Sequence, residues 1–185
     1  MEEKELISLL IQKDESAFKW LVETYRNKVY NTVLNILQDE EDADDSAQEV
    51  FIQVYESISS FKQQSSLSTW IYRIAVRKAL DKLRKRRTRQ QLRKFLPWWM
   101  PEEKRSEDRN FYHPGVALEK KQKAAALFKA IETLPENQKV AITLIKIQGM
   151  NYEEASKIMN QSIKAIESLI SRAKQNLQKQ LQNMI

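Results

Sequence analysis

The sequence contains no cysteine, one histidine and only two glycines among its 185 residues. Without cysteine the chain cannot form disulfides, thiolate metal sites or a thiol nucleophile, and one histidine excludes a histidine-rich metal centre. Loops that bind nucleotide phosphates need several closely spaced glycines, so Walker and Rossmann motifs are absent. These scarcities argue against an enzyme, and we expect no catalytic residue, no metal and no cofactor.

Long hydrophobic runs are also missing. No apolar stretch approaches the roughly 20 residues that a membrane span requires. The first residues, Met1–Glu5, are acidic and are not followed by the pattern of a signal peptide. We therefore expect a cytoplasmic protein, and the absence of cysteine fits a reducing compartment.

Charge is distributed unevenly along the chain. The total is +6, but residues 1–66 carry −8, residues 67–113 carry +9 and residues 114–185 carry +5. This asymmetry predicts an acidic surface for one kind of partner and basic surfaces suited to a polyanion.

Apolar residues recur at spacings of three and four over most of the sequence, and no segment has a convincing strand pattern. Neither glycine nor proline occurs before Pro97, whereas residues 88–115 hold Pro97, Pro101, Pro114 and Gly115. We predict an all-α fold with two small helical domains, residues 1–87 and 116–185, joined by a flexible linker at 88–115.

Several residues are typical of helix ends. The run Asp14–Ser16 favours a helix cap and is expected to end the first helix, and the acidic residues 39–45 suit the N-terminus of the third. Gly149 is expected to end a helix in the left-handed conformation. Asn151 and Glu154 have the spacing of a capping box at the start of the next helix.

The last two helices have helix-turn-helix character. A short helix after Asn151, a turn at residues 160–162 and a longer terminal helix form this pattern. The terminal helix has a polar face suited to base edges and phosphates, although an ordinary solvated face has the same composition. The side chains of this face are those of Lys164, Glu167, Ser168, Ser171, Arg172, Lys174 and Gln175.

The basic middle of the chain combines cations with aromatic residues. Its cations are Lys62, Arg73, Arg77, Lys78, Lys82, Arg84, Lys85, Arg86 and Arg87, and its aromatic residues are Phe61, Trp70 and Tyr72. Cations follow a phosphate backbone and aromatic rings stack on exposed bases. A loop at residues 61–66 beside this helix is suited to holding an unstacked base. The alternative is that the aromatic residues are core and the charges are solvated.

The third predicted helix is acidic. Its polar residues are Asp42, Asp44, Asp45, Gln48, Glu49 and Gln53. No histidine or second acidic motif converges on them, so a protein-binding surface or a solvated face is favoured over acid–base catalysis. Trp98 and Trp99 lie in the predicted linker, and we expect them to dock on a neighbouring domain or a partner.

Two groups of motifs resemble a known family. The segments Ala43–Phe51 and Ser68–Ala75, together with Phe61, Asp81 and Arg84, resemble region 2 of bacterial sigma factors of the extracytoplasmic-function (ECF) group. A second set of segments resembles the region-4 helix-turn-helix of that group, namely Leu134–Gln138, Gly149, Tyr152–Ala155 and Ser171–Ala173. The two signatures occur in the family's order and cover nearly the whole chain outside the linker.

The resemblance implies a transcription initiation factor that binds core RNA polymerase and promoter DNA, recognises the −10 and −35 elements and promotes promoter opening. Binding to the clamp helices of the largest polymerase subunit is implied for Asp44, Asp45, Gln48, Glu49 and Phe51. Contact with the −10 element is implied for Phe61, Lys62, Ser65, Leu67, Ser68, Thr69, Trp70, Arg73 and Arg77. Contact with the −35 element is implied for Ser162, Lys164, Glu167, Ser168, Ser171, Arg172 and Lys174. The flap of the second subunit and an anti-sigma factor are further partners that the resemblance suggests.

The chain departs from the family pattern at three positions. Glu167 replaces a usual basic residue and could accept a hydrogen bond from cytosine. Leu169 replaces a usual arginine, and Arg77 stands where asparagine is common. The promoter sequence therefore cannot be carried over from the family.

Two other functions compete with this interpretation. A stand-alone helix-turn-helix regulator would bind duplex DNA without polymerase, but it has no need of a base-trapping loop. A nucleic-acid enzyme is the third hypothesis, and the lack of clustered histidine or cysteine argues against it.

Overall fold

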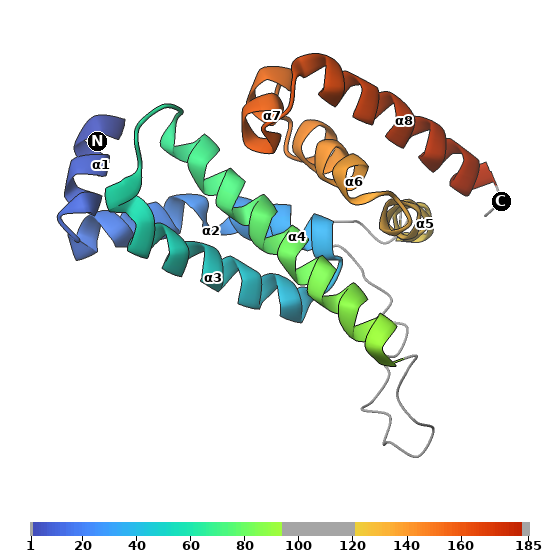
Figure 1. Cartoon of the computed structure of the whole chain (residues 1–185), viewed down its shortest axis with the longest axis horizontal. Coiled ribbons are helices and arrows are strands. Elements are labelled where there is room, and N and C mark those ends of the chain that lie inside the picture. The colour runs from blue at the N-terminus through green and yellow to red at the C-terminus, as the bar shows by residue number, and fades with distance from the viewer. Residues whose placement is uncertain (1, 94–120, 183–185) are drawn as a thin grey trace.

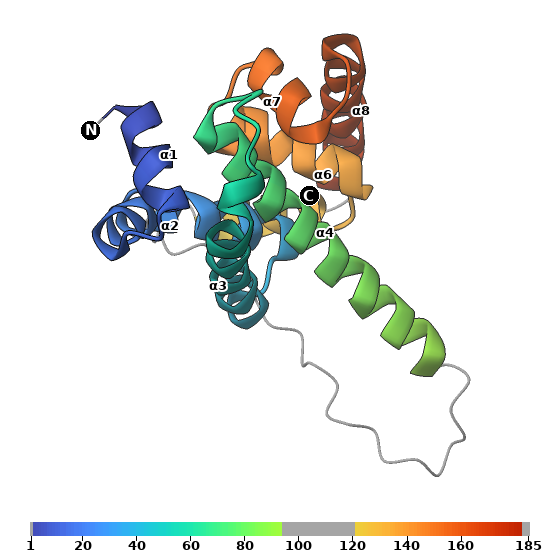
Figure 2. The ribbon, with the colours of Figure 1, turned by 60° about the vertical axis from the view of Figure 1, so that its left-hand side comes forward.

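The computed structural model describes residues 2–93 and 121–182. Over these two ranges the chain is helical and forms no strand, which confirms the all-α prediction. Helices from the two ranges lie against each other rather than standing apart (Figures 1 and 2).

The N-terminal domain is built on three long helices that pack pairwise (Figure 1). Its elements are α1 (Glu3–Ile11), α2 (Glu15–Leu37), α3 (Glu40–Ser57), the 3-10 turn η1 (Ile58–Ser60) and α4 (Leu67–Arg93). The largest side chains that are fully buried here include Leu21, Leu34, Ile36, Ile58, Leu67 and Ile71. Burial of these apolar faces is the main force that holds the helices together.

The C-terminal domain is smaller. Its elements are α5 (Lys121–Glu132), α6 (Glu136–Ile142), the π-helical turn η3 (Thr143–Ile147), α7 (Tyr152–Met159) and α8 (Ile163–Gln182). Leu144 and Ile166 are fully buried between these helices. The short α7, a tight turn and the longer α8 form the predicted helix-turn-helix (Figure 1).

The predicted helix ends are confirmed. The Asp14 carboxylate accepts a hydrogen bond from the Ala17 amide at 2.7 Å. The side chain of Asn151 accepts from the Glu154 amide, and the Glu154 side chain accepts from the Asn151 amide, each at 2.9 Å. Gly149 has φ +70°, the left-handed region that favours glycine.

Two boundaries differ from the prediction. Helix α4 continues to Arg93, six residues beyond the expected domain end at 87, because no glycine or proline interrupts it before Pro97. The helix expected to end near Ile147 is regular only to Ile142 and finishes in the π-helical turn η3. The remaining predicted linker residues, with Trp98 and Trp99, lie outside the described residues.

Candidate nucleic-acid and protein interfaces

The acidic surface lies on α3. Asp44, Asp45, Gln48 and Glu49 are all exposed on this helix. Phe51 is only 8% exposed and belongs to the hydrophobic core, so it can support the surface only from beneath. Directly one turn after Gln48, Ile52 is 57% exposed. Sequence reasoning missed Ile52, although its spacing of four from Gln48 places both residues on one helix face.

Ion pairs from α4 hold this surface in place. Lys82 Nζ lies 3.0 Å from Asp42 Oδ1 and 3.7 Å from Asp45 Oδ2. Lys78 Nζ lies 3.1 Å from Glu49 Oε2. Arg86 contacts Asp42 as well and lies 3.2 Å from Asp39. Part of the basic charge of α4 is therefore neutralised within the domain and is not available to DNA.

Asp42 is the centre of this network. Partial burial opposes its ionisation, but hydrogen bonds and charges from Lys82 and Arg86 outweigh burial and lower the pKa of the Asp42 carboxyl. The same hydrogen bond with Asp42 raises the pKa of Lys82. Both groups are thus held in their charged forms, and Asp42 acts as a structural anchor behind the exposed residues Asp45 and Glu49.

The loop before α4 is fixed by a serine cap. Ser66 Oγ accepts a hydrogen bond from the Thr69 amide at 3.2 Å. Glu3 of α1 accepts from the Leu67 amide at 3.2 Å, a contact that the sequence did not indicate. This anchoring places residues 61–66 at the N-terminus of α4.

Two aromatic side chains beside this loop, Phe61 and Trp70, pack against each other. The rings of Phe61 and Trp70 lie 5.0 Å apart with a 32° tilt. Phe61, Leu67 and Thr69 are buried, at 8%, 0% and 7% exposure, so they shape the loop from within. The predicted −10 residues that reach the surface here are Lys62, Ser65, Ser68 and Trp70.

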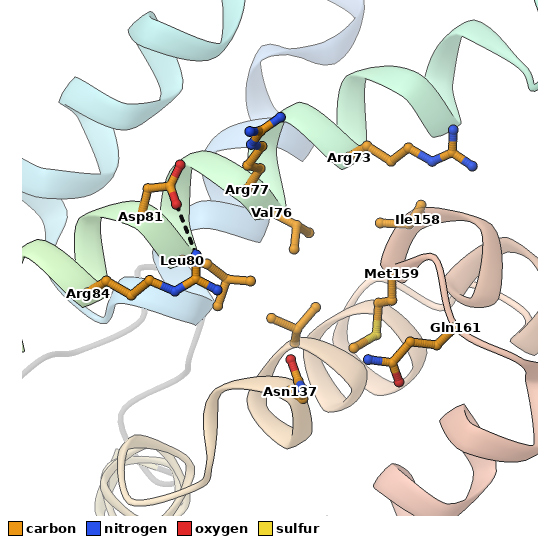
Figure 3. Close-up of a pocket in the computed structure, with 11 residues that line it drawn as sticks. Arg73, Val76, Arg77, Leu80, Asp81, Arg84, Asn137, Ile158, Met159 and Gln161 are labelled. Atoms are coloured by element: carbon orange, nitrogen blue, oxygen red, sulfur yellow. Dashed lines mark hydrogen bonds and ion pairs between the residues drawn. The ribbon is translucent and has the colours of Figure 1, made fainter.

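Arg73 and Arg77 lie further along α4, near the C-terminal domain. They line a cleft of about 340 Å³ together with residues of α6 and α7 (Figure 3). Arg73 Nε donates to the Lys157 carbonyl oxygen at 2.7 Å. Arg73 is therefore half-buried beside the helix-turn-helix, whereas Arg77 remains exposed to solvent.

The predicted −35 residues of α8 are all exposed. Ser162 also caps the helix, since its Oγ accepts from the Ala165 amide at 3.2 Å. Leu169, which replaces a usual arginine, is only 8% exposed and packs in the core. The polar face of α8 is otherwise free of neighbouring helices at Lys164, Glu167, Ser168, Ser171, Arg172 and Lys174.

Among residues 2–93 and 121–182, no three histidine or acidic side chains gather as a metal site. No helix of this described part of the chain is both long and apolar enough to cross a membrane.

Comparison with known proteins assigns both domains. Residues 21–89 match the model of Sigma-70 region 2, and residues 124–177 match that of Sigma-70 region 4. The ECF RNA polymerase sigma-E factor of Haemophilus influenzae is 32% identical over 97% of this chain and 95% of that protein. The chain is an ECF sigma factor of the sigma-70 family. The sigma-E factor of Escherichia coli is a further relative, 30% identical over 97% of this chain and 94% of that protein.

Solved structures resemble this sigma factor over most of its length. The sigma factor RpoE of Bartonella quintana, crystallised with the anti-sigma factor NepR, aligns with a TM-score of 0.69 and 25% identity over 89% of this chain and 96% of that one. CnrH in complex with the cytosolic domain of CnrY aligns equally well at 20% identity, over 98% and 97%, and shows the shared fold. This sigma factor is therefore a transcription initiation factor and not a stand-alone regulator.

Proposed function

We propose that this sigma factor docks on core RNA polymerase through the exposed α3 surface of Asp44, Asp45, Gln48 and Glu49. What carries the proposal is the combination of four exposed polar side chains with one exposed apolar residue, Ile52, on a helix that α4 holds rigid. An apolar anchor with a polar rim is typical of protein interfaces. Phe51 supports this surface from the core.

From the family resemblance we propose that this surface binds the clamp helices of the largest polymerase subunit. We propose likewise that the C-terminal domain binds the flap of the second subunit. The factor itself performs no chemistry. It selects the promoter and opens it, while the polymerase makes RNA. It acts in the cytoplasm, on the nucleoid, together with the polymerase.

The −10 element is assigned to the loop and first turns of α4. Trp70 is half-buried and stacked on Phe61, so its ring has a fixed orientation toward an unpaired base. Lys62 is exposed beside it and suits a phosphate. Ser65 and Ser68 offer hydroxyls, while Phe61, Leu67 and Thr69 maintain the shape of the loop.

The −35 element is assigned to α8. Its N-terminal half presents Lys164, Glu167 and Ser168 to a major groove, as in other helix-turn-helix proteins. Ser162 and Ser171 offer hydroxyls, and Arg172 and Lys174 suit phosphates. The burial of Leu169 means that its difference from arginine removes no side chain from the exposed face.

An anti-sigma factor is proposed as a further partner. Two similar solved structures are complexes, one of them with the anti-sigma factor NepR. Affinity purification of this sigma factor from its own cells, without applied stress, tests the proposal. Recovery of a stoichiometric protein besides the polymerase subunits is expected, and recovery of polymerase subunits alone would contradict it.

The docking surface is tested by Asp45→Ala combined with Gln48→Ala. The affinity for purified core polymerase should fall at least about tenfold, which corresponds to about 1.4 kcal/mol, because residues at the centre of an interface dominate its energy. Glu23→Ala, an exposed acidic residue of α2 outside this surface, is the matched control and should bind normally. Unchanged core binding by the double variant would exclude this surface.

A further inference from the structure

The N-terminal helix α1 lies beside the segment that leads into α4. Its apolar side chains Leu6, Ile7 and Leu10 are 4%, 2% and 3% exposed, so α1 is a fixed part of the hydrophobic core. The helix packs against α2 and against η1, the turn that immediately precedes the loop at residues 61–66 (Figure 1). The position of α1 relative to this loop is therefore set by the core.

Glu3 connects the N-terminus of α1 to the N-terminus of α4. Its Oε1 accepts a hydrogen bond at 3.2 Å from the amide of Leu67, which is the first residue of α4 and is fully buried. The first amides of a helix have no acceptor within the helix, and a negative charge at that end is favourable. Ser66 satisfies the Thr69 amide by a local contact. Glu3 satisfies another of these amides from a position 64 residues earlier in the chain.

The loop between η1 and α4 depends on how its two ends are held. Residues 62–64 are exposed, and Gln63 has φ +54°, a left-handed conformation that side chains other than glycine rarely adopt. One end of this strained segment is fixed by η1, and the other is fixed by the start of α4, which Glu3 caps. Trp70 follows Leu67 by less than one turn of α4, so a displacement of that turn moves the Trp70 ring with it.

We propose that Glu3 is a positioning residue for promoter opening. By capping α4 it keeps the loop and the Trp70 ring in the orientation that receives an unpaired base of the −10 element, and it makes no contact with DNA itself. This inference rests on the proposed −10 role of the loop and of Trp70. Charge alone predicts the opposite effect, because a carboxylate repels phosphates and its removal should strengthen DNA binding. The positioning role predicts that loss of the cap weakens opening.

Two variants of Glu3 separate the cap from the charge. Glu3→Gln keeps an oxygen that accepts from the Leu67 amide and removes only the charge, so it should retain most of the opening activity. Glu3→Ala removes the acceptor, and the ratio of open to closed promoter complexes should fall about fivefold, the usual effect of losing an N-terminal cap. Glu5→Ala, exposed on the same helix, removes the same charge and is the matched control that should open promoters normally.

The cap is measured first in the free chain. Amide hydrogen exchange at Leu67, followed by nuclear magnetic resonance, should accelerate about fivefold in Glu3→Ala and change little in Glu3→Gln. The affinity of both variants for purified core polymerase should equal that of the parent chain, because Glu3 lies outside the proposed α3 surface. Opening is then measured with core polymerase by the permanganate reactivity of thymines, on a promoter whose start site has been mapped with the parent chain.

Equal opening by Glu3→Ala and the parent chain, or an equal defect in Glu3→Ala and Glu3→Gln, would overturn the inference. So would improved opening in both variants, which would assign the effect of Glu3 to its charge. Trp70→Ala distinguishes these failures from failure of the proposed function. If Trp70→Ala loses opening while Glu3→Ala keeps it, the −10 role stands and the inference alone fails. If Trp70→Ala opens promoters normally, the −10 role is refuted and the inference with it.

Discussion

Asp42 is predicted to be the residue of the acidic helix that matters most for stability. Its carboxylate contacts both Lys82 and Arg86 of α4, and the three side chains are 21%, 28% and 33% exposed. Asp42→Asn removes the negative charge with little change of shape. It leaves two partly buried cations without their main partner.

The magnitude follows from this intermediate burial. Exposed ion pairs contribute 0.2–1 kcal/mol, whereas breaking a buried pair costs 3–5 kcal/mol, so we expect Asp42→Asn to lower the free energy of unfolding by about 2 kcal/mol. For a domain of this size, about 2 kcal/mol corresponds to a fall in melting temperature of about 10 °C. This fall in melting temperature is measured by following circular dichroism at 222 nm against temperature at pH 7.

The pH dependence has a definite sign. The folded state lowers the pKa of Asp42, so its contribution is complete above the unfolded value, which is about 4 for aspartate, and is lost as the pH falls through the lower folded pKa. The stability difference between the parent chain and Asp42→Asn should therefore shrink below about pH 4. Asp44→Asn, an exposed neighbour, is the matched control. Equal melting of Asp42→Asn and Asp44→Asn at pH 7 would refute the anchoring role.

Three further predictions concern the helix ends and the aromatic pair. Gly149→Ala should destabilise the C-terminal domain by about 1 kcal/mol in urea titrations, because its φ of +70° strains a side chain. Asn151→Ala should cost about 1 kcal/mol by removing the capping box, and amide exchange at Glu154 should accelerate. Trp70→Ala should abolish promoter opening measured by permanganate reactivity, with Trp20→Ala, exposed on α2, as the control that retains it.

The helix ends could be predicted from the sequence because the residues that determine them are neighbours in the chain. Helix caps depend on neighbours within four residues, so the capping run Asp14–Ser16, Gly149 and the pair Asn151 and Glu154 could be placed without knowledge of the fold. The alternation of acidic and basic segments likewise anticipated that α3 and α4 have opposite charge. These features require no long-range information.

Burial within a motif was harder to predict. Phe51 lies two residues after Glu49, about half a helical turn away, so it points to the core while Glu49 points outward. Leu67 and Thr69 are buried at the start of α4, where Glu3 of α1 accepts from the Leu67 amide and Ser66 Oγ lies 2.9 Å from Thr69 Oγ1. The helical periodicity places Phe51 and Ile52 on different faces of α3 and could have shown which of them is buried. The family motif alone does not tell which of its residues contact a partner and which support the surface from the core.

Contacts between distant segments could not be predicted at all. Arg73 and Lys157 are 84 residues apart, and Glu3 and Leu67 are 64 apart. Such pairings depend on how complete helices pack, and no periodicity or cap specifies them. The positive charge of α4 therefore suggested a surface open to DNA, whereas much of it faces α3 and the C-terminal domain.

The central claim is that this chain directs polymerase to promoters through the α3 surface and two DNA-reading domains. Mapping RNA 5′ ends made in vitro by purified core polymerase on genomic DNA, with and without the chain, tests it most directly. We predict discrete new start sites that share two upstream elements and that disappear with Asp45→Ala plus Gln48→Ala. Identical start sites with and without the chain would contradict the claim.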